Sequence, residues 1–245
     1  MRLIQAVRTL FGFESSAEYE IIDGTDADAA DGWRSPEIAA RQHEQYGVLL
    51  RDVRAGRARA DLRAAADAVR EAGIHDSRVV EIGCGSGYYS EILAALTGSL
   101  RYLGIDYSAA MIRLARKAYP RERFVVADAA RLPLANGSCD VALSGNSLMH
   151  IPAYAGAVKE MARVARRWCV FHAVPVLEQR ATTRLRKKAY GTTVFELTFN
   201  RAELESLFAD AGLAVRSVRE VFPYDLSHVL GEHTRLLTYA CETRS

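Results

Sequence analysis

The stretch that decides the fold is Val79–Ser90, which reads VVEIGCGSGYYS. An apolar run typical of a β-strand leads directly into three glycines at alternate positions, Gly83, Gly85 and Gly87. The acid Glu81 stands two residues before the first glycine. Glycine has no Cβ, so such a backbone turns sharply and lets a ligand approach closely. A strand that ends in a glycine-rich turn and opens a helix is typical of a nucleotide-sized binding site.

The spacing of these glycines differs from the dinucleotide fingerprint, which needs G-x-G-x-x-G or G-x-G-x-x-A. The sixth position is Tyr88 when counted from Gly83 and Ser90 when counted from Gly85. The pattern E-x-G-x-G-x-G instead resembles motif I of the class I S-adenosylmethionine-dependent methyltransferases. In that family the loop holds the amino acid part and the ribose of the cofactor. The alternative is a glycine-rich turn in another α/β protein.

Predicted strands and helices alternate from residue 76 onward, which favours βαβ units in an open, doubly wound α/β sheet. We predict helices over 35–54, 59–72, 88–96, 108–117, 154–165 and 202–211, and strands over 78–82, 100–105, 124–127, 139–144, 168–173, 213–221 and 236–241. The resemblance implies a mostly parallel seven-stranded sheet in which the last strand runs antiparallel beside the fifth.

We predict two parts: an N-terminal helical cap over 1–75 and the cofactor-binding domain over 76–245. Within the cap, 1–13 reads as a short amphipathic helix against the domain or a partner, with weak membrane contact as the alternative. The acidic stretch 14–34 reads as a loop. A basic insert over 175–199 reads either as a lid-like flap for an acidic small molecule or as a solvated face or subunit contact.

Composition limits the classes of function. The chain has 245 residues, 49% of them hydrophobic, which suits one α/β domain with a sizeable core. A net charge of +2 without a clustered basic surplus argues against a nucleic-acid partner, and no apolar run is long enough for a membrane span. The four cysteines form no C-x-x-C pair, which indicates a reduced, cytoplasmic protein. A small molecule is the expected substrate, and a homodimer remains open.

The resemblance also implies which residues hold the cofactor, S-adenosylmethionine. Asp106 follows the glycine loop by about 20 residues, where a carboxylate accepts from both ribose hydroxyls; helix capping is the alternative role. Asp128 is implied to accept from the adenine amine, and the backbone N–H of Ala129 to serve ring N1. The implied cofactor set is Glu81, Gly83, Cys84, Gly85, Gly87, Tyr88, Asp106, Tyr107, Met111, Asp128, Ala129, Ser144, Gly145 and Asn146.

Three residues are candidates for catalysis. His150 is a candidate general base, because an imidazole titrates near neutral pH, and a structural histidine beside the cofactor is the alternative. His172 ends a predicted strand, where α/β sheets bind ligands, and Tyr190 lies in the basic insert. The acidic set of the metal-dependent catechol-type enzymes is missing, so no metal is expected. For Trp33, His43 and Tyr46 of the cap, ordinary packing is favoured over contact with the cofactor.

The activity that the resemblance implies is methyl transfer to oxygen, nitrogen or carbon of a small molecule. Such an enzyme mainly places the nucleophile in line with the sulfonium methyl and excludes water. It needs a base only where the nucleophile must lose a proton. Two alternatives remain: an enzyme of this fold that catalyses another displacement, such as cyclisation of the aminobutyrate chain, and a non-catalytic binding or scaffold protein.

Overall fold

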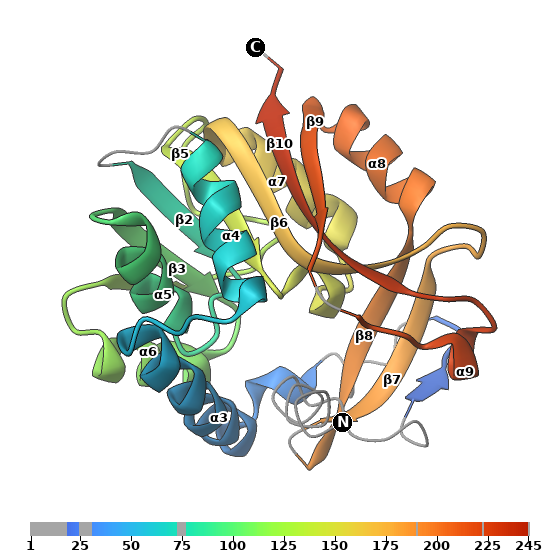
Figure 1. Cartoon of the computed structure of the whole chain (residues 1–245), viewed down its shortest axis with the longest axis horizontal. Helices are drawn as coiled ribbons and strands as arrows, with labels where there is room; N and C mark the ends of the chain where they lie inside the picture. Colours follow the sequence, from blue (N-terminus) through green and yellow to red (C-terminus); the bar gives the residue numbers. More distant parts are fainter. Residues whose placement is uncertain (1–18, 25–30, 73–76, 190, 222, 245) are drawn as a thin grey trace.

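Seven strands of a ten-stranded sheet form the centre of the protein in our computed structural model, which describes residues 19–24, 31–72, 77–189, 191–221 and 223–244 (Figure 1). The strand order is β4-β3-β2-β5-β6-β10-β9. The parallel strands are β2 (Arg78–Ile82), β3 (Arg101–Asp106), β4 (Arg123–Val126), β5 (Cys139–Gly145) and β6 (Ala165–Leu177). Strand β10 (Arg235–Thr243) runs antiparallel between β6 and β9 (Leu213–Glu220). The predicted doubly wound, mostly parallel seven-stranded sheet is confirmed.

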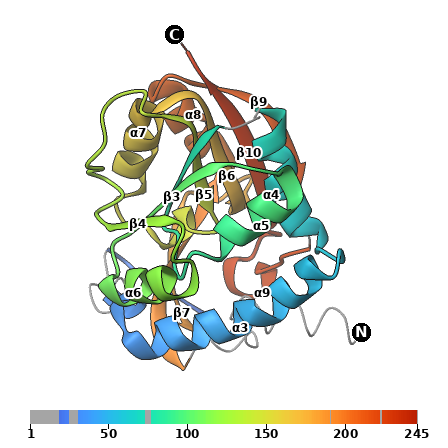
Figure 2. The same ribbon diagram turned by 90° about the vertical axis from the view of Figure 1, so that its left-hand side faces the viewer.

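Helices cover both faces of this sheet, as Figure 2 shows. Side chains alternate between the faces of a strand, so neighbouring apolar residues serve different cores. In β2, Val79 packs with α4 and α5, whereas Val80 packs in the larger cluster with α7 and α8. These helices are α4 (Ala60–Glu71), α5 (Tyr88–Thr97), α7 (Tyr154–Val164) and α8 (Arg201–Asp210), and α6 (Ala109–Ala118) packs against β3 and β4.

The cap contributes one long helix, α3 (Pro36–Arg54), where a helix was predicted. Ser35 begins it, since its hydroxyl accepts from the backbone N–H of Glu37 at 3.2 Å and of Ile38 at 3.4 Å. Pro36 suits the first helical position because proline has no N–H of its own that would be left unsatisfied there. The apolar stripe of α3 packs on α5 through Tyr46, Leu49, Leu50, Val53, Tyr88, Tyr89 and Ile92.

The insert after β6 is a β-hairpin and not the long loop that we predicted. Its strands β7 (Thr183–Ala189) and β8 (Thr192–Asn200) are antiparallel, and β8 continues the main sheet by pairing with the end of β6. The reason is an alternation of apolar residues within the charged stretch, which buries Leu185, Val194, Phe195, Leu197 and Phe199. The loop prediction for 14–34 is also wrong in part. Strand β1 (Tyr19–Ile21) pairs with β7, and η2 (Gly32–Arg34) is a 3₁₀ turn.

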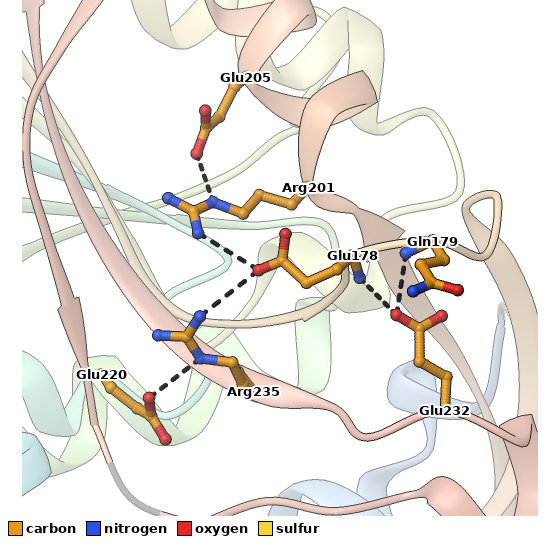
Figure 3. Close-up of polar contacts among 7 residues, drawn as sticks. All are labelled: Glu178, Gln179, Arg201, Glu205, Glu220, Glu232 and Arg235. Atoms are coloured by element: carbon orange, nitrogen blue, oxygen red, sulfur yellow. Dashed lines mark hydrogen bonds and ion pairs between the residues drawn. The ribbon is translucent and has the colours of Figure 1, made fainter.

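The base of the hairpin is held by polar contacts (Figure 3). The carboxylate of Glu232, which lies between α9 (Ser227–Leu230) and β10, accepts from three successive backbone N–H groups, those of Glu178, Gln179 and Arg180, at 2.7–2.9 Å. Glu178 in turn pairs with Arg201 of α8 and Arg235 of β10 at 3.3 and 3.4 Å. Exposed ion pairs of this kind contribute little, roughly 0–1 kcal/mol each. The carboxylate on three amides nevertheless defines the turn from which β7 departs.

Candidate active site

A cavity of about 530 Å³ lies at the carboxyl ends of β2, β3, β4 and β5, where open α/β sheets bind ligands. The cap closes it on one side through η2 and α3, and the turn η3 (Leu148–His150) lies on another side. Most of the residues implied to hold the cofactor meet in this cavity. They are Gly83, Gly85, Tyr88, Asp106, Tyr107, Met111, Asp128, Ala129, Gly145 and Asn146.

Gly83 and Gly85 are required by both conformation and space. Their φ angles are +72° and +53°, in the left-handed region that side chains other than glycine rarely adopt. A Cβ on Gly83 would lie 2.5 Å from the Cβ of Ser147, and one on Gly85 would lie 2.8 Å from Oε1 of Gln42. The loop is fixed to the end of β3, because the backbone N–H of Gly83 donates to the carbonyl of Ile105 at 2.8 Å.

Four residues of the implied set lie behind the cavity wall, which corrects our placement of them. Gly87 packs on the core, since a Cβ there would meet the Phe124 ring at 2.7 Å. Cys84 lies in the same apolar cluster as Phe124. Ser144 is fully buried, with its hydroxyl 2.8 Å from that of Ser147. Glu81 is fully buried as well.

Glu81 lies beneath the glycine loop and accepts a hydrogen bond from the hydroxyl of Tyr102. Burial raises the pKa of its carboxyl to about 8, and the nearby charge of Asp106 raises it further, while the Tyr102 bond opposes them. At pH 7 this carboxyl is therefore mainly protonated in the folded protein. Among the described residues, none donates a hydrogen bond to its second oxygen, Oε1.

Replacing Glu81 with glutamine is expected to remove a pH dependence from stability. The pKa in the folded state, about 8, exceeds the ordinary value of 4.5, so the native protein binds this proton more tightly than the unfolded chain does. The free energy of unfolding of the wild type therefore falls as pH rises from about 4.5 to about 8. In urea titrations Glu81→Gln should match the wild type near pH 5 and exceed it by on the order of 3 kcal/mol near pH 8. An equal difference at both pH values would contradict this account.

Asp106 faces the cavity from the end of β3. Its carboxylate accepts from the backbone N–H of Gly85 at 2.9 Å and of Ser108 at 2.8 Å. Burial raises its pKa to about 6, and these two amides oppose the rise. The capping role belongs to Ser108, whose hydroxyl accepts from Met111 at the start of α6. Each carboxylate oxygen can accept more than one hydrogen bond, and each oxygen of Asp106 accepts one from these amides, so Asp106 keeps acceptor capacity for a ligand.

His150 and Trp33 form a second wall of the cavity, with ring centroids 4.8 Å apart. Nδ1 of His150 lies 2.8 Å from the carbonyl oxygen of Phe195. A carbonyl only accepts, so Nδ1 carries the hydrogen and Nε2 keeps the lone pair. Burial lowers the pKa of His150 to about 4, and Lys187 lowers it further, while Glu196 and the Phe195 carbonyl oppose the change. The imidazole is therefore neutral at physiological pH.

Of the other two catalytic candidates, the structure describes only His172. His172 is buried outside the cavity, with Nδ1 2.8 Å from the hydroxyl of Thr238 and its ring against the edge of Tyr89. Because packing separates it from the cavity, we withdraw it as a catalytic residue. Tyr190 lies outside the described residues, as does the predicted amphipathic helix over 1–13.

Within the part of the chain that the structure describes, no three His, Cys, Asp or Glu residues gather as a metal site. Nor does any helix there have the length and apolar character that crossing a membrane requires.

In sequence, known proteins resemble this chain mainly in the part that builds the cavity. Residues 80–171 match the model of the family described as "Methyltransferase domain". A Mycolicibacterium smegmatis protein named "Probable S-adenosylmethionine-dependent methyltransferase" is 31% identical over 144 residues, 59% of this chain and 54% of the relative. Over this stretch the chain resembles the S-adenosylmethionine-dependent methyltransferases. It spans about half the length of this curated relative.

Solved structures share the methyltransferase fold over most of the chain. The 1,6-didemethyltoxoflavin-N1-methyltransferase of Burkholderia thailandensis, with bound 1,6-didemethyltoxoflavin and S-adenosylhomocysteine, has a TM-score of 0.60 at 19% identity. The match covers 93% of this chain and 95% of that one. The [4+2]-cyclase SpnF has a TM-score of 0.58 at 15% identity and covers 74% of this chain and 81% of its own.

The cavity fits S-adenosylmethionine, the cofactor named in the matching relatives, on its own chemistry. The two glycines leave space beside the loop, and Asp106 offers a carboxylate to hydroxyl donors. Among the described residues, Oε1 of Gln42 and Oδ1 of Asn146 are buried side-chain oxygens without a hydrogen-bond donor. Such buried oxygens are rare unless a water or ligand serves them. An ammonium group supplies the donors that they lack.

Several residues of the cavity wall belong to no sequence motif. Tyr46 of α3 stacks on Tyr88 with ring centroids 3.6 Å apart, and both rings line the cavity. Tyr46 and Trp33 therefore pack against neighbouring residues and also form part of the cavity wall. Gln42 and Ser147 were not singled out at all. Their helix and loop carry no local signal, and only the folding of α3 across the sheet edge brings Gln42 to the glycine loop. His43, its neighbour, does not line this cavity.

Proposed function

We propose that this protein transfers the methyl group of S-adenosylmethionine to oxygen, nitrogen or carbon of a small molecule. The observation that supports it is that one cavity joins the glycine loop to a wall made of Trp33, Tyr46, Tyr88 and His150. That wall is aromatic, and of these four rings only the imidazole has an ordinary pKa near neutral pH. The limited volume, about 530 Å³, suits the cofactor together with a small acceptor.

We assign the adenosine end of the cofactor to β3 and β4. Asp106 would accept from the ribose hydroxyls, and Asp128 and the Ala129 N–H would face the adenine edge. Asp128 Oδ1 accepts from the N–H of Ala130 at 2.9 Å, which holds the carboxylate in place. Val126 lines the same part of the cavity and is 47% exposed, unusually for a valine that ends a strand, and a purine ring would cover it.

We assign the amino acid end to the glycine loop and to Asn146. This asparagine has a φ of +60°, which asparagine tolerates better than most residues, and its N–H donates to the carbonyl of His172 at 3.1 Å. The turn directs it into the cavity across from Gln42. The two side-chain oxygens would accept from the ammonium group.

When bound, the cofactor supplies a methyl group that is already activated on a sulfonium. The chain's own contribution is to hold the acceptor and to remove its proton where one must leave. Trp33 and the Tyr46–Tyr88 stack exclude water and restrict the orientation of the acceptor. Nε2 of His150 is the neutral acceptor for a proton from an O–H, N–H or C–H group.

The test is product analysis on the whole chain. The protein is incubated with S-adenosylmethionine and a panel of phenols, amines and carboxylic acids, and S-adenosylhomocysteine and methylated product are measured together. Both products support the proposal. Methylthioadenosine would indicate displacement within the aminobutyrate chain. No binding of S-adenosylhomocysteine at millimolar concentration would indicate a scaffold. The identity of the product matters because SpnF, which shares the fold, is a [4+2]-cyclase.

Asp106 is expected to make cofactor affinity depend on pH. Its ionised form accepts from hydroxyls, and its pKa is about 6, so affinity for S-adenosylhomocysteine should weaken as pH falls from 7.5 to 5. The expected loss is about tenfold. Asp106→Ala should bind about 1–3 kcal/mol more weakly at pH 7.5 and lose this dependence. Calorimetry at the two pH values measures both effects, and an equal slope in the variant would remove Asp106 from the site.

The boundary between a cap over 1–75 and a domain over 76–245 stays a prediction, as do the homodimer, the cytoplasmic location and the lack of a nucleic-acid partner. The aromatic wall supports a small-molecule acceptor and does not depend on them.

A further inference from the structure

A buried ion pair lies inside the hairpin, close to the cavity wall that His150 and Trp33 form. Lys187 of β7 and Glu196 of β8 contact each other, and their side chains are 3% and 0% exposed. In the register of the hairpin Lys187 lies opposite Val194, so Glu196 is its diagonal neighbour on the same face. The hydroxyl of Tyr224 donates to Glu196 at 2.6 Å, and Nζ of Lys187 lies 5.8 Å from the centre of the Tyr19 ring.

This pair is a poor device for stability alone. Taking two charges out of water offsets most of their attraction, and well-packed apolar residues of similar volume commonly stabilise as much or more. An apolar cluster that includes Leu185, Leu226 and Leu230 covers the pair, so apolar partners were available. A buried, charged cluster beside a cavity is more typical of a functional site.

The pair is linked to His150 by one residue of β8. Phe195, directly before Glu196, provides the carbonyl to which Nδ1 of His150 donates at 2.8 Å. The two charges also act on the imidazole itself, with opposite effects: Lys187 lowers the pKa of His150 and Glu196 raises it. Within the described part of the chain, no other charged group acts comparably on this ring, and Trp33 packs against it from η2.

We propose that Lys187 and Glu196 are positioning residues for His150. Their ion pair holds the segment of β8 whose Phe195 carbonyl orients the ring, and their opposite charges balance at the imidazole. The hairpin, which the sequence presents as a lid or a solvated face, thereby sets the tautomer and the charge of the base. This inference rests on the proposed function only in that His150 acts as a base; the electrostatic effect itself needs no acceptor.

The experiment is an NMR titration of the full chain with isotope-labelled histidine and no acceptor. In the wild type the nitrogen shifts of His150 should show Nδ1 protonated at pH 7. Lys187→Met should raise the pKa of His150 by about one, since a like charge is lost and Glu196 is left unopposed. Glu196→Gln should lower it. The double variant should return close to the wild-type value.

A matched control is the exposed pair of Arg186 with Glu20, which bridges β7 and β1 one position away at 2.6 Å and is 40% and 63% exposed. Arg186→Met should leave His150 unchanged. If either single variant fails to fold, the pKa of His150 in the double variant and the tautomer in the wild type still test the positioning role. Any of three results would overturn the inference. The first is a wild-type ring protonated on Nε2. The second is a pKa of His150 displaced as far in the double variant as in Lys187→Met, and the third is a shift of that pKa in the same direction in both single variants.

The outcome is separable from that of the proposed function. Opposite shifts without methylation of any acceptor would leave the positioning role standing and would count against the proposed activity. Methylation with a titration indifferent to both variants would do the reverse. With an acceptor in hand, the acidic limb of the kcat/KM profile should move in the direction of the NMR pKa in Lys187→Met, which a merely structural role would not produce.

Discussion

Gly85→Val is expected to abolish cofactor binding while the fold survives. The residue has a φ of +53°, and a side chain there would project into the cavity toward Gln42. Valine would occupy the space beside the loop and strain the backbone by about 1–2 kcal/mol. We expect the affinity for S-adenosylhomocysteine to fall more than about 100-fold, or roughly 2.7 kcal/mol. Calorimetry measures the affinity, and circular dichroism reports whether the fold is retained.

Gly212→Val is the matched control for backbone strain. Gly212 ends α8 with a φ of +77° and has open space around it, far from the cavity. It should lose comparable stability and bind the cofactor normally. If the two variants bind equally well, the glycine loop does not hold the cofactor, and the placement of the site fails with it.

His150→Gln is expected to lower kcat by about 10²- to 10⁴-fold for an acceptor that must lose a proton. Glutamine can still donate to the Phe195 carbonyl, so the wall should keep its shape, but no basic nitrogen remains. Affinity for S-adenosylhomocysteine should be unchanged. Since the pKa of His150 is about 4, the wild-type rate should show no loss between pH 8 and 6 from this group and should fall only as pH approaches 4.

His172→Gln separates catalysis from the effects of altering any buried histidine. This ring is buried and its pKa is also lowered to about 4, but it bonds to Thr238 outside the cavity. The variant should lose stability while kcat per folded molecule stays unchanged. Equal losses of kcat in the two variants would mean that His150 is structural. An unchanged His150→Gln would indicate an acceptor that reacts without losing a proton.

The central sheet could be predicted because its signals are local. Apolar runs separated by helical periods define β2, β3, β4 and β5 to within about two residues. The hairpin of β7 and β8 could not be predicted, because its basic residues concealed an alternation of apolar residues. Its pairing with the main sheet also depends on β6 continuing through Pro175 to Leu177. Strand β1 exists only because β7 offers an edge to it.

Within the site, sequence alone determined the glycine loop, Asp106 and the position of His150, since each follows a strand by a short, defined spacing and strand ends converge at one edge of the sheet. It could not tell Gly85, which faces the cavity, from Gly87, which faces Phe124, because both have the same backbone requirement. Tertiary packing made that choice. It also brought Trp33 and Gln42 to the cavity and placed Lys187 and Glu196 near His150. These segments lie far apart in the chain, and no local pattern encodes their contacts.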